Sequence, residues 1–281
     1  MKVDNAIIMA AGTSSRFAPL SIEKPKGLLE VKGEILIERQ IKQLKEAGIE
    51  EIIVVVGYKK ELFDYLKEKY GVILIENDMC DTRNNHYSLY AAREYLKNSY
   101  ICSADNYYVK NIFTNEEEAC NYATVYSEGY TDEWCVWLDD EGYINKIKVG
   151  AADTWYMFGQ AFFSSDFSKK YIEIVERDLN TKEIENKYWE DILKENLDVL
   201  KMKIKPFDKG IIEEFDSLEE LRKFDKTYIN DTRSKILKNI AKEKQVEEKD
   251  IVVVDTIKKE GQTEAIGFKY KIKDSVYEYL Y

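Results

Sequence analysis

The sequence predicts an α/β fold in which a mixed, mostly parallel sheet carries helices on both faces. Between Ala6 and Asp105, short β-branched runs alternate with amphipathic stretches of helical spacing. The first of these runs passes directly into a loop of small residues around Gly12. After about residue 120 the texture changes to short aromatic-rich strands, which would extend the sheet with antiparallel pieces.

In the first half, apolar runs too short for helices predict strands, and apolar residues three or four positions apart predict helices. Parallel strands present their carboxyl ends at one edge of a sheet, so a ligand is expected at that edge. The expected strands are a run from Ala6, then 52–56, 72–75 and 100–104, and the expected helices are 36–44, 62–66 and 87–96.

In the second half, four short strands are expected at 122–126, 134–138, 143–149 and 154–163, with a hairpin turn at 139–142. Helices are expected at 168–177 and 189–195, and a further strand at 202–204. Ser217 is expected to cap a helix over 218–228, with Glu220 completing a capping box.

Residues 230–281 depart from this pattern and form a predicted small α+β extension after a first domain of residues 1–229. A helix capped within Asn230–Thr232 would run to about Lys244. Strands are expected at 250–257, 266–272 and 276–281, with a turn at Gly261. The order of elements resembles the beginning of a choline-kinase-type lobe. The alternative is a folded tail that packs on the main domain or on a partner.

The loop from Ala10 to Lys26 combines small residues with cations. Ala10, Ala11 and Gly12 leave room for a base or phosphate beside the backbone, while Thr13, Ser14 and Ser15 add hydroxyl and amide donors. Arg16, Lys24 and Lys26 supply positive charge, and this combination at a strand end suits a polyphosphate. The alternative is an ordinary glycine-containing turn with solvated lysines.

Composition excludes several classes of protein. A net charge of −11 argues against general nucleic-acid binding, because a phosphate backbone would be repelled. The 4 cysteines form no C-x-x-C pair and no apolar run approaches a membrane span, so a reduced cytoplasmic protein without membrane insertion is expected. His86 is the only histidine, which argues against a Ser-His-Asp triad, a histidine-rich zinc site and a histidine general base.

The pattern Ala-Ala-Gly-x-x-x-Arg-Phe-x-Pro, followed by Lys-Pro-Lys, resembles the signature loop of the sugar-phosphate nucleotidyltransferase superfamily. More specifically, the chain is similar to bacterial CTP:phosphocholine cytidylyltransferases over roughly residues 5–228. One departure is Ser14, where many family members carry a second glycine. The further segments that carry the likeness are 38–41, 56–58, 84–90, 104–107 and 188–191.

Asp105 directly follows a strand and is placed to hold Mg²⁺ opposite the phosphate loop. Mg²⁺ usually takes one or two protein carboxylates, so a second acid is expected. The resemblance implies Asp216, and Glu214, on the same strand face by alternation, is the fallback. The alternative role for Asp216 is a helix N-cap.

The activity that the resemblance implies is Mg²⁺-dependent transfer of a cytidylyl group from CTP to phosphocholine, giving CDP-choline and pyrophosphate. Arg16 and Lys26 would hold the triphosphate and the departing pyrophosphate, with Lys26 preferred to Lys24 because it matches the family's catalytic lysine. The implied nucleotide-binding residues are Ala10, Ala11, Gly12, Thr13, Ser14, Ser15, Asn85, Ser88 and Asp105, with Asn85 and Ser88 in the base-reading region.

A quaternary ammonium forms no hydrogen bonds and is recognised by aromatic faces and nearby carboxylates. The candidates for this choline site are Trp134, Trp155, Tyr188 and Trp189, with Asp191 beside them. The alternative, in a chain with 21 tyrosines, is that these rings belong to an ordinary core.

Other functions stay open at this point. The same fold could serve another phosphorylated amino-alcohol, aminoethylphosphonate or a sugar-1-phosphate. A glycosyltransferase would carry Asp-x-Asp where this chain has Asp105-Asn106, and a non-catalytic nucleotide sensor would release no pyrophosphate. Beyond CTP and phosphocholine, the expected partners are a second copy of the chain or a kinase domain after residue 281.

Overall fold

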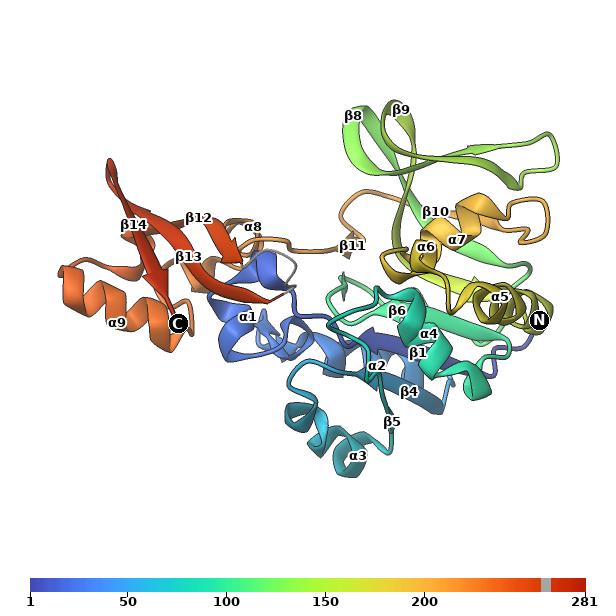
Figure 1. Cartoon of the computed structure of the whole chain (residues 1–281), viewed down its shortest axis with the longest axis horizontal. Helices are drawn as coiled ribbons and strands as arrows, with labels where there is room; N and C mark the ends of the chain where they lie inside the picture. The colour runs from blue at the N-terminus through green and yellow to red at the C-terminus, as the bar shows by residue number, and fades with distance from the viewer. Residues whose placement is uncertain (259–263) are drawn as a thin grey trace.

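The computed structural model describes residues 1–258 and 264–281 and is organised around a seven-stranded sheet (Figure 1). The strand order is β10-β8-β9-β6-β1-β4-β5. Neighbours are parallel except where β9 pairs antiparallel with β6 and β8, which confirms the mixed, mostly parallel sheet. Its strands are β1 (Asn5–Ala10), β4 (Glu51–Val56), β5 (Ile73–Glu76), β6 (Ser99–Ser103), β8 (Asn121–Leu138), β9 (Ile144–Phe163) and β10 (Lys203–Phe207).

Helices cover both faces of this sheet, as expected. The stretch expected as one helix around Leu62 is divided into a 3-10 turn, η3 (Lys60–Phe63), and α3 (Tyr65–Tyr70). The other α-helices are α1 (Leu20–Glu23), α2 (Leu36–Glu46), α4 (His86–Ala91), α5 (Ser165–Asp178), α6 (Lys182–Glu185), α7 (Trp189–Glu195), α8 (Leu218–Phe224) and α9 (Lys235–Lys244). The remaining 3-10 turns are η1 (Ser15–Phe17), η2 (Lys26–Leu28), η4 (Arg93–Tyr95), η5 (Lys226–Ile229) and η6 (Glu248–Asp250).

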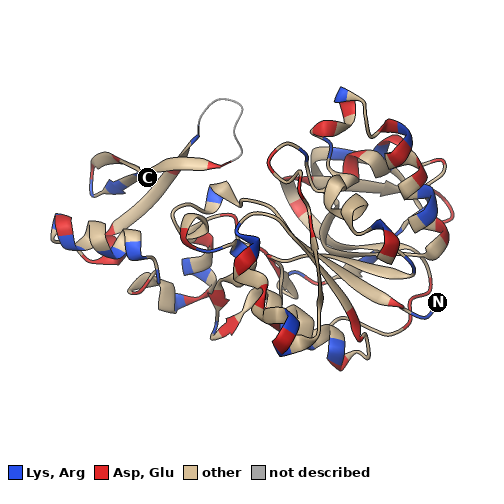
Figure 2. Cartoon of the chain, turned by 60° about the horizontal axis from the view of Figure 1, so that its bottom comes forward, with Lys and Arg blue, Asp and Glu red and all other residues tan. Residues whose placement is uncertain are grey.

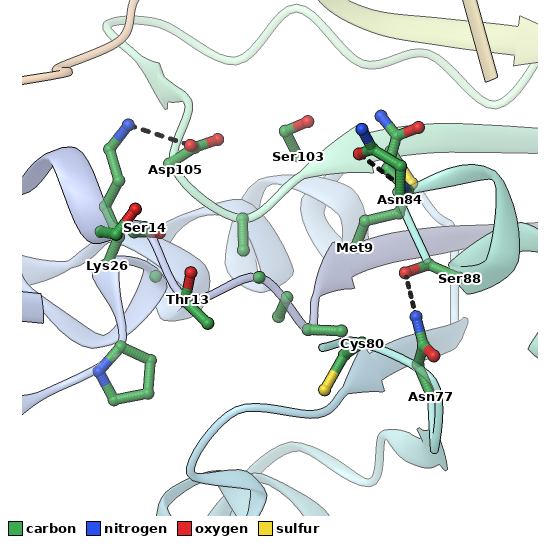
Figure 3. Close-up of a pocket in the computed structure, with 18 of the residues that line it drawn as sticks. Met9, Thr13, Ser14, Lys26, Asn77, Cys80, Asn84, Ser88, Ser103 and Asp105 are labelled. Atoms are coloured by element: carbon green, nitrogen blue, oxygen red, sulfur yellow. Dashed lines mark hydrogen bonds and ion pairs between the residues drawn. The ribbon is translucent and has the colours of Figure 1, made fainter. Parts of the chain in front are cut away.

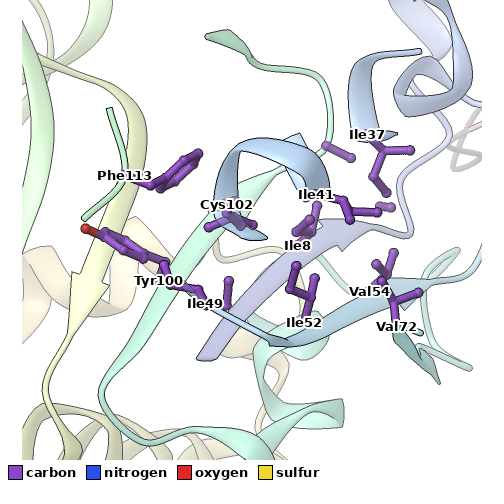
Figure 4. Packing of buried hydrophobic residues seen from close by; sticks show 14 of the residues in the cluster. Ile8, Ile37, Ile41, Ile49, Ile52, Val54, Val72, Tyr100, Cys102 and Phe113 are labelled. Atoms are coloured by element: carbon purple, nitrogen blue, oxygen red, sulfur yellow. The ribbon is translucent and has the colours of Figure 1, made fainter. Parts of the chain in front are cut away.

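Strand alternation divides the apolar residues of the sheet between two cores. On β1, Ile8 packs in a cluster with Ile37 and Ile41 of α2 (Figure 4). Ile7, which alternates with Ile8, packs in a second cluster on the opposite face. All these side chains are fully buried, and each contributes about 1.5–3 kcal/mol of hydrophobic stabilisation. This burial on both faces fixes the register of the strands, and so it fixes where their carboxyl ends lie.

The four short strands expected between Tyr122 and Phe163 are two long ones. β8 and β9 pair over most of their length and continue beyond the sheet as a twisted ribbon (Figure 1). The register shifts several times, and Gly129 and Gly150 adopt positive φ near these shifts. In the sequence, the residues at these register shifts interrupt the strand pattern and suggest separate strands. In the structure, the two strands continue through them as β-bulges. The hairpin turn at 139–142 is confirmed, with Gly142 donating to the Asp139 carbonyl at 3.0 Å.

The C-terminal part forms a second, three-stranded antiparallel sheet of order β12-β13-β14 beside α1 and α9 (Figure 1). Its strands are β12 (Ile251–Lys258), β13 (Ala265–Ile272) and β14 (Ser275–Leu280). The cap of α9 is Ser234 rather than a residue of Asn230–Thr232, because the Thr232 hydroxyl is bound by Glu248. The turn expected at Gly261 lies outside the described residues.

A third core joins this sheet to the loop after β1. Phe17 and Leu20 pack in the same cluster as Leu237, Ile240 and Phe268. Two short two-stranded sheets complete the fold. They pair β2 (Glu30–Val31) with β3 (Glu34–Ile35), and β7 (Tyr107–Tyr108) with β11 (Ile212–Glu213).

Charged side chains gather on the helices and turns, while the central strands are largely free of them (Figure 2). Within the described residues, no helix is long and apolar enough to cross a membrane.

Candidate active site

A cavity of about 790 Å³ opens where β1 and β6 end (Figure 3). Parallel strands with adjacent carboxyl ends form such a crevice, as the sequence pattern predicts. Thirteen of the predicted site residues line it: Ala10, Ala11, Gly12, Thr13, Ser14, Ser15, Arg16, Lys26, Asn85, Ser88, Asp105, Tyr188 and Asp216. The fallback acid Glu214 also lines it, together with Asn77, Arg83 and Lys258.

Lys26 stands at the centre of the charged part of this cavity. Its side chain is 5% exposed, and Nζ donates to Asp105 Oδ2 at 3.0 Å (Figure 3). The Asp216 and Glu214 carboxylates lie 3.6 Å and 3.9 Å from the same nitrogen. The two acids are separated by the buried Phe215, so strand-like alternation turns both towards the cavity.

Gly27 explains how Lys26 comes so close to Asp105. A Cβ at Gly27 would lie 2.9 Å from the Ala104 Cβ and 3.3 Å from the Ala104 carbonyl oxygen. The loop therefore packs directly against the end of β6 only because residue 27 has no side chain. This close packing places the ammonium of Lys26 beside the carboxylate of Asp105.

Three acids around one ammonium leave the cluster with excess negative charge. Burial alone would lower the pKa of Lys26, but Asp105, Glu214 and Asp216 outweigh it and raise that pKa, so the lysine stays charged. The charge of Asp105, helped by burial, raises the pKa of Glu214 to about 8. A further positive charge beside Glu214 would lower this pKa again and favour the ionised carboxylate.

These acids fit a hard cation. The described residues contain no group of three or more His, Cys, Asp or Glu side chains spaced as metal ligands. Mg²⁺, however, requires only one or two carboxylates when phosphate oxygens and water complete its shell. The oxygen-only donors Asp105 and Asp216, and the raised pKa of Glu214, suit such an ion.

Asp216 is not the N-cap of α8, so the cap role expected as its alternative is excluded. The N-cap of α8 is Ser217, whose hydroxyl accepts from the Glu220 amide at 3.2 Å. The expected capping box is displaced, since Glu220 Oε2 accepts from the Asp216 amide at 2.7 Å. The Asp216 carboxylate is left facing Arg16, whose Nη1 lies 3.0 Å away, and Lys26.

In the phosphate loop, Ser14 has a strained backbone conformation and Gly12 has open space beside it. Ser14 adopts φ 47° and ψ 41°, the left-handed region that glycine occupies without strain. The departure from the family pattern at this position thus retains a glycine-like conformation. Apart from its two chain neighbours, no described residue has an atom within 4 Å of where a Cβ of Gly12 would stand, so that space is open to a ligand.

Asn85 links the cavity wall to α7. Its Oδ1 accepts from the Trp189 amide at 2.8 Å, and its Nδ2 donates to Glu190 Oε2 at 3.4 Å. Because both ends of this amide are engaged, its visible role is to hold the start of α7. Ser88 instead accepts from Asn77 Nδ2 at 3.0 Å on the cavity wall (Figure 3).

The predicted choline residues are not gathered in one place. Tyr188 lines the cavity, and Trp134 contacts its ring edge-on, with centroids 6.3 Å apart. Trp189 is 2% exposed and stacks on Tyr122 in the core, and Trp155 packs edge-on against Tyr126. Asp191 accepts from the Tyr188 amide at 3.0 Å, which makes it part of the capping box of α7.

Sequence reasoning missed several residues of the cavity wall. Arg83 and Asn77 lie on the long connection between β5 and α4, and Lys258 ends β12. The Asn84-Asn85 pair, which belongs to the family likeness, could have pointed to these two residues, because it lies in the same polar connection. No local pattern marks Lys258, since tertiary packing alone brings it to the cavity.

The single histidine, His86, does not line the cavity. It is buried, with Nδ1 2.7 Å from the Lys187 carbonyl oxygen.

The proteins most informative for comparison are cytidylyltransferases. The MobA-like NTP transferase domain matches residues 6–114. A choline-phosphate cytidylyltransferase from Streptococcus pneumoniae is 38% identical over 226 residues, which cover 80% of this chain and 99% of the relative. A 2-aminoethylphosphonate cytidylyltransferase from Lancefieldella rimae is 38% identical over 235 residues, covering 82% of this chain and 95% of the relative. The solved CTP:phosphocholine cytidylyltransferase of Streptococcus pneumoniae is 39% identical, with a TM-score of 0.76 over 81% of this chain and 99% of its own.

Proposed function

The chain belongs to the bacterial cytidylyltransferase family that includes these choline-phosphate and aminoethylphosphonate enzymes, and we propose that it transfers a cytidylyl group from CTP to phosphocholine. The products are CDP-choline and pyrophosphate. The observation that carries the proposal is the convergence of Asp105, Glu214 and Asp216 on the buried Lys26, beside the small-residue loop.

The reaction joins two anions. An oxygen of the phosphocholine phosphate attacks the α-phosphorus of CTP, and the bond from that phosphorus to the bridging oxygen breaks, so pyrophosphate leaves with the electron pair. The attacking oxygen is already ionised near neutral pH, because its second pKa is about 6. No general base is required, which agrees with a cavity whose described wall contains no histidine.

Neutralisation and positioning are therefore the work of the protein. Lys26 and Arg16 would contact the triphosphate and the departing pyrophosphate, while the backbone at Ala11 and Gly12 leaves room for the nucleotide. Arg16 is 74% exposed and bound to Asp216 in this structure, so it would exchange that partner for phosphate oxygens.

Asp105 and Asp216 are the residues that would hold Mg²⁺, with Glu214 beside them. When bound, the ion supplies positive charge to the phosphate oxygens. Asp105 and Asp216 already bind the same ammonium, so their carboxylates require little rearrangement to share another cation.

Tyr188 and Trp134 are the residues that we propose for the choline end. Their rings meet edge-on, so a trimethylammonium group at the cavity wall would contact aromatic faces. Trp189 and Asp191 would support this wall as packing and capping residues. Trp155, which packs edge-on against Tyr126, does not line the cavity and is not assigned to this site.

The experiment that tests the function measures pyrophosphate release with each nucleotide and acceptor in turn. CTP, UTP and dTTP would be combined with phosphocholine, phosphoethanolamine and glucose-1-phosphate. Highest kcat/KM for CTP with phosphocholine is expected. Binding of CTP without pyrophosphate release from any acceptor would favour a nucleotide sensor instead.

A second candidate acceptor is 2-aminoethylphosphonate. The observation that favours it is the 2-aminoethylphosphonate relative, as similar to this chain as the phosphocholine one. A primary ammonium would need hydrogen-bond acceptors and would depend less on the aromatic pair. Adding this compound to the acceptor panel decides between the two.

The cell compartment and partners remain part of the proposal. All 4 cysteines are free, which supports a reducing cytoplasmic setting. A homo-oligomer, and the assignment of residues 230–281 as a separate extension or a partial kinase-like lobe, stay predictions.

A further inference from the structure

The C-terminal extension is hydrogen-bonded to the part of the phosphate loop that lies between Arg16 and Lys26. The carboxylate of Glu23 accepts from the Ser234 hydroxyl at 2.7 Å and from the amides of Lys235 and Ile236 at 2.9 Å and 2.8 Å. A carboxylate bound to the amino end of α9 is favoured by the helix dipole as well as by these hydrogen bonds. The extension is therefore held at a fixed place beside the loop.

Apolar packing reinforces this attachment. Phe17, at the end of η1, is 2% exposed and shares its cluster with Phe268 of β13. Tyr228, just before the extension, donates to the Glu30 carbonyl oxygen at 2.6 Å. Together these contacts place β12 against the loop that would receive the nucleotide.

One side chain of the extension reaches the cavity. Lys258, the last residue of β12, lines it together with Gly12–Phe17. It makes no ion pair with any residue that the structure describes, and it is exposed. The other cationic lining residues are engaged: Arg16 with Asp216, Lys26 with Asp105, and Arg83 with the Leu179 carbonyl oxygen at 2.8 Å.

An ammonium that has no ion-pair partner among the described residues, beside a loop shaped for phosphate, is suited to a charged oxygen ligand. The cavity walls otherwise carry the carboxylates of Asp81, Asp105, Glu214 and Asp216, which repel a polyphosphate. A further cation near η1 would offset this repulsion where the terminal phosphates of a nucleotide lie against Ser15 and Arg16.

We propose that Lys258 is a polyphosphate-binding residue contributed by the C-terminal extension, and that it contacts the two phosphates of CTP that leave as pyrophosphate. The inference rests on the proposed function, because it places the triphosphate on the loop. It gives the extension a direct part in substrate binding.

The test measures binding of CTP, CMP and inorganic pyrophosphate to the full chain by calorimetry, with Mg²⁺ and without acceptor. Lys258→Ala is expected to weaken binding of CTP and pyrophosphate about tenfold and to leave CMP binding unchanged. Lys258→Arg should restore most of the affinity. The matched control is Lys271→Ala, which removes an exposed lysine on β13 that does not line the cavity.

Unchanged CTP and pyrophosphate binding in Lys258→Ala would overturn the inference, as would an equal loss for CMP, which would indicate a general effect on the loop. A failure of the proposed function and a failure of the Lys258 role give different results. A wild-type chain that binds no CTP contradicts the proposed function. A wild-type chain that binds CTP and releases pyrophosphate, alongside an indistinguishable Lys258→Ala variant, contradicts only the role of Lys258.

Discussion

The two ends of the cavity differ in how their side chains are placed. At the nucleotide end, residues directly after β1 and β6 meet because parallel strands end together, and Lys26 reaches Asp105 across the close contact at Gly27. At the acceptor end, the aromatic residues lie on long bulged strands and on α7, so neighbours in the sequence turn to different sides. Backbone topology thus determines where the side chains lie at the nucleotide end, whereas side-chain packing determines it at the acceptor end.

The largest effect should come from the nucleotide end. Lys26→Ala is expected to lower kcat/KM for CTP by about 10²–10³-fold, because it removes a buried charge from the phosphates. Lys24→Ala is the matched control, since Lys24 lies two residues away and does not line the cavity. Because Lys26→Ala leaves three acids without their cation, Asp105→Asn provides a second variant that should lose activity at ordinary Mg²⁺. Pyrophosphate release measures both, and activity within threefold of wild type in both would contradict the assignment.

The buried acids at the two ends of the cavity also differ in their charged neighbours. Glu190 of α7 is buried without a cation, and burial raises its pKa to about 7, whereas the acids of the nucleotide end share Lys26. As pH rises from about 4.5 to 7, the unfolded chain loses this proton before the folded one, so the free energy of unfolding falls by up to about 1.4 kcal/mol per pH unit. Glu190→Gln should remove that part of the slope in urea titrations between pH 5 and 8. Glu183→Gln, at an exposed site, should leave it unchanged.

The acceptor end would be tested directly by its rings. Tyr188→Ala is expected to raise the KM for phosphocholine about tenfold with little change in the KM for CTP, since one cation–π contact contributes about 0.5–2 kcal/mol. Trp155→Leu, which alters a ring outside the cavity wall, should leave both constants close to wild type. If the two variants raise the KM for phosphocholine equally, the acceptor site includes Trp155 and the distinction drawn here is wrong.

The smallest effect concerns the loop backbone. Ser14→Gly is expected to stabilise the fold by about 0.5–1 kcal/mol, because glycine adopts the left-handed conformation of residue 14 without strain. Ser15→Gly, at a position with ordinary φ in η1, should destabilise by a similar amount. Thermal unfolding of both variants measures the difference, and a loss of stability in Ser14→Gly would contradict the strain argument.

The same difference between the two ends explains which features of the fold and the site could be predicted from the sequence. Strand–helix alternation was enough for the sheet and for the place of the loop and Asp105 at the strand ends, because these depend on local order along the chain. The position of Asp216 on the cavity wall came from the family pattern instead. Trp189 could not be distinguished from a cavity residue, since only its stacking on Tyr122 shows that it faces the core. Lys258 was out of reach because its position depends on contacts between the first and last parts of the chain.

The bond between Glu23 and the start of α9 also has a consequence for how the protein is made. A ribosome synthesises Phe17 more than two hundred residues before Leu237 and Phe268, which share its buried cluster. This cluster cannot be completed until the C-terminal extension has been made, so the loop reaches its final form long after it is translated.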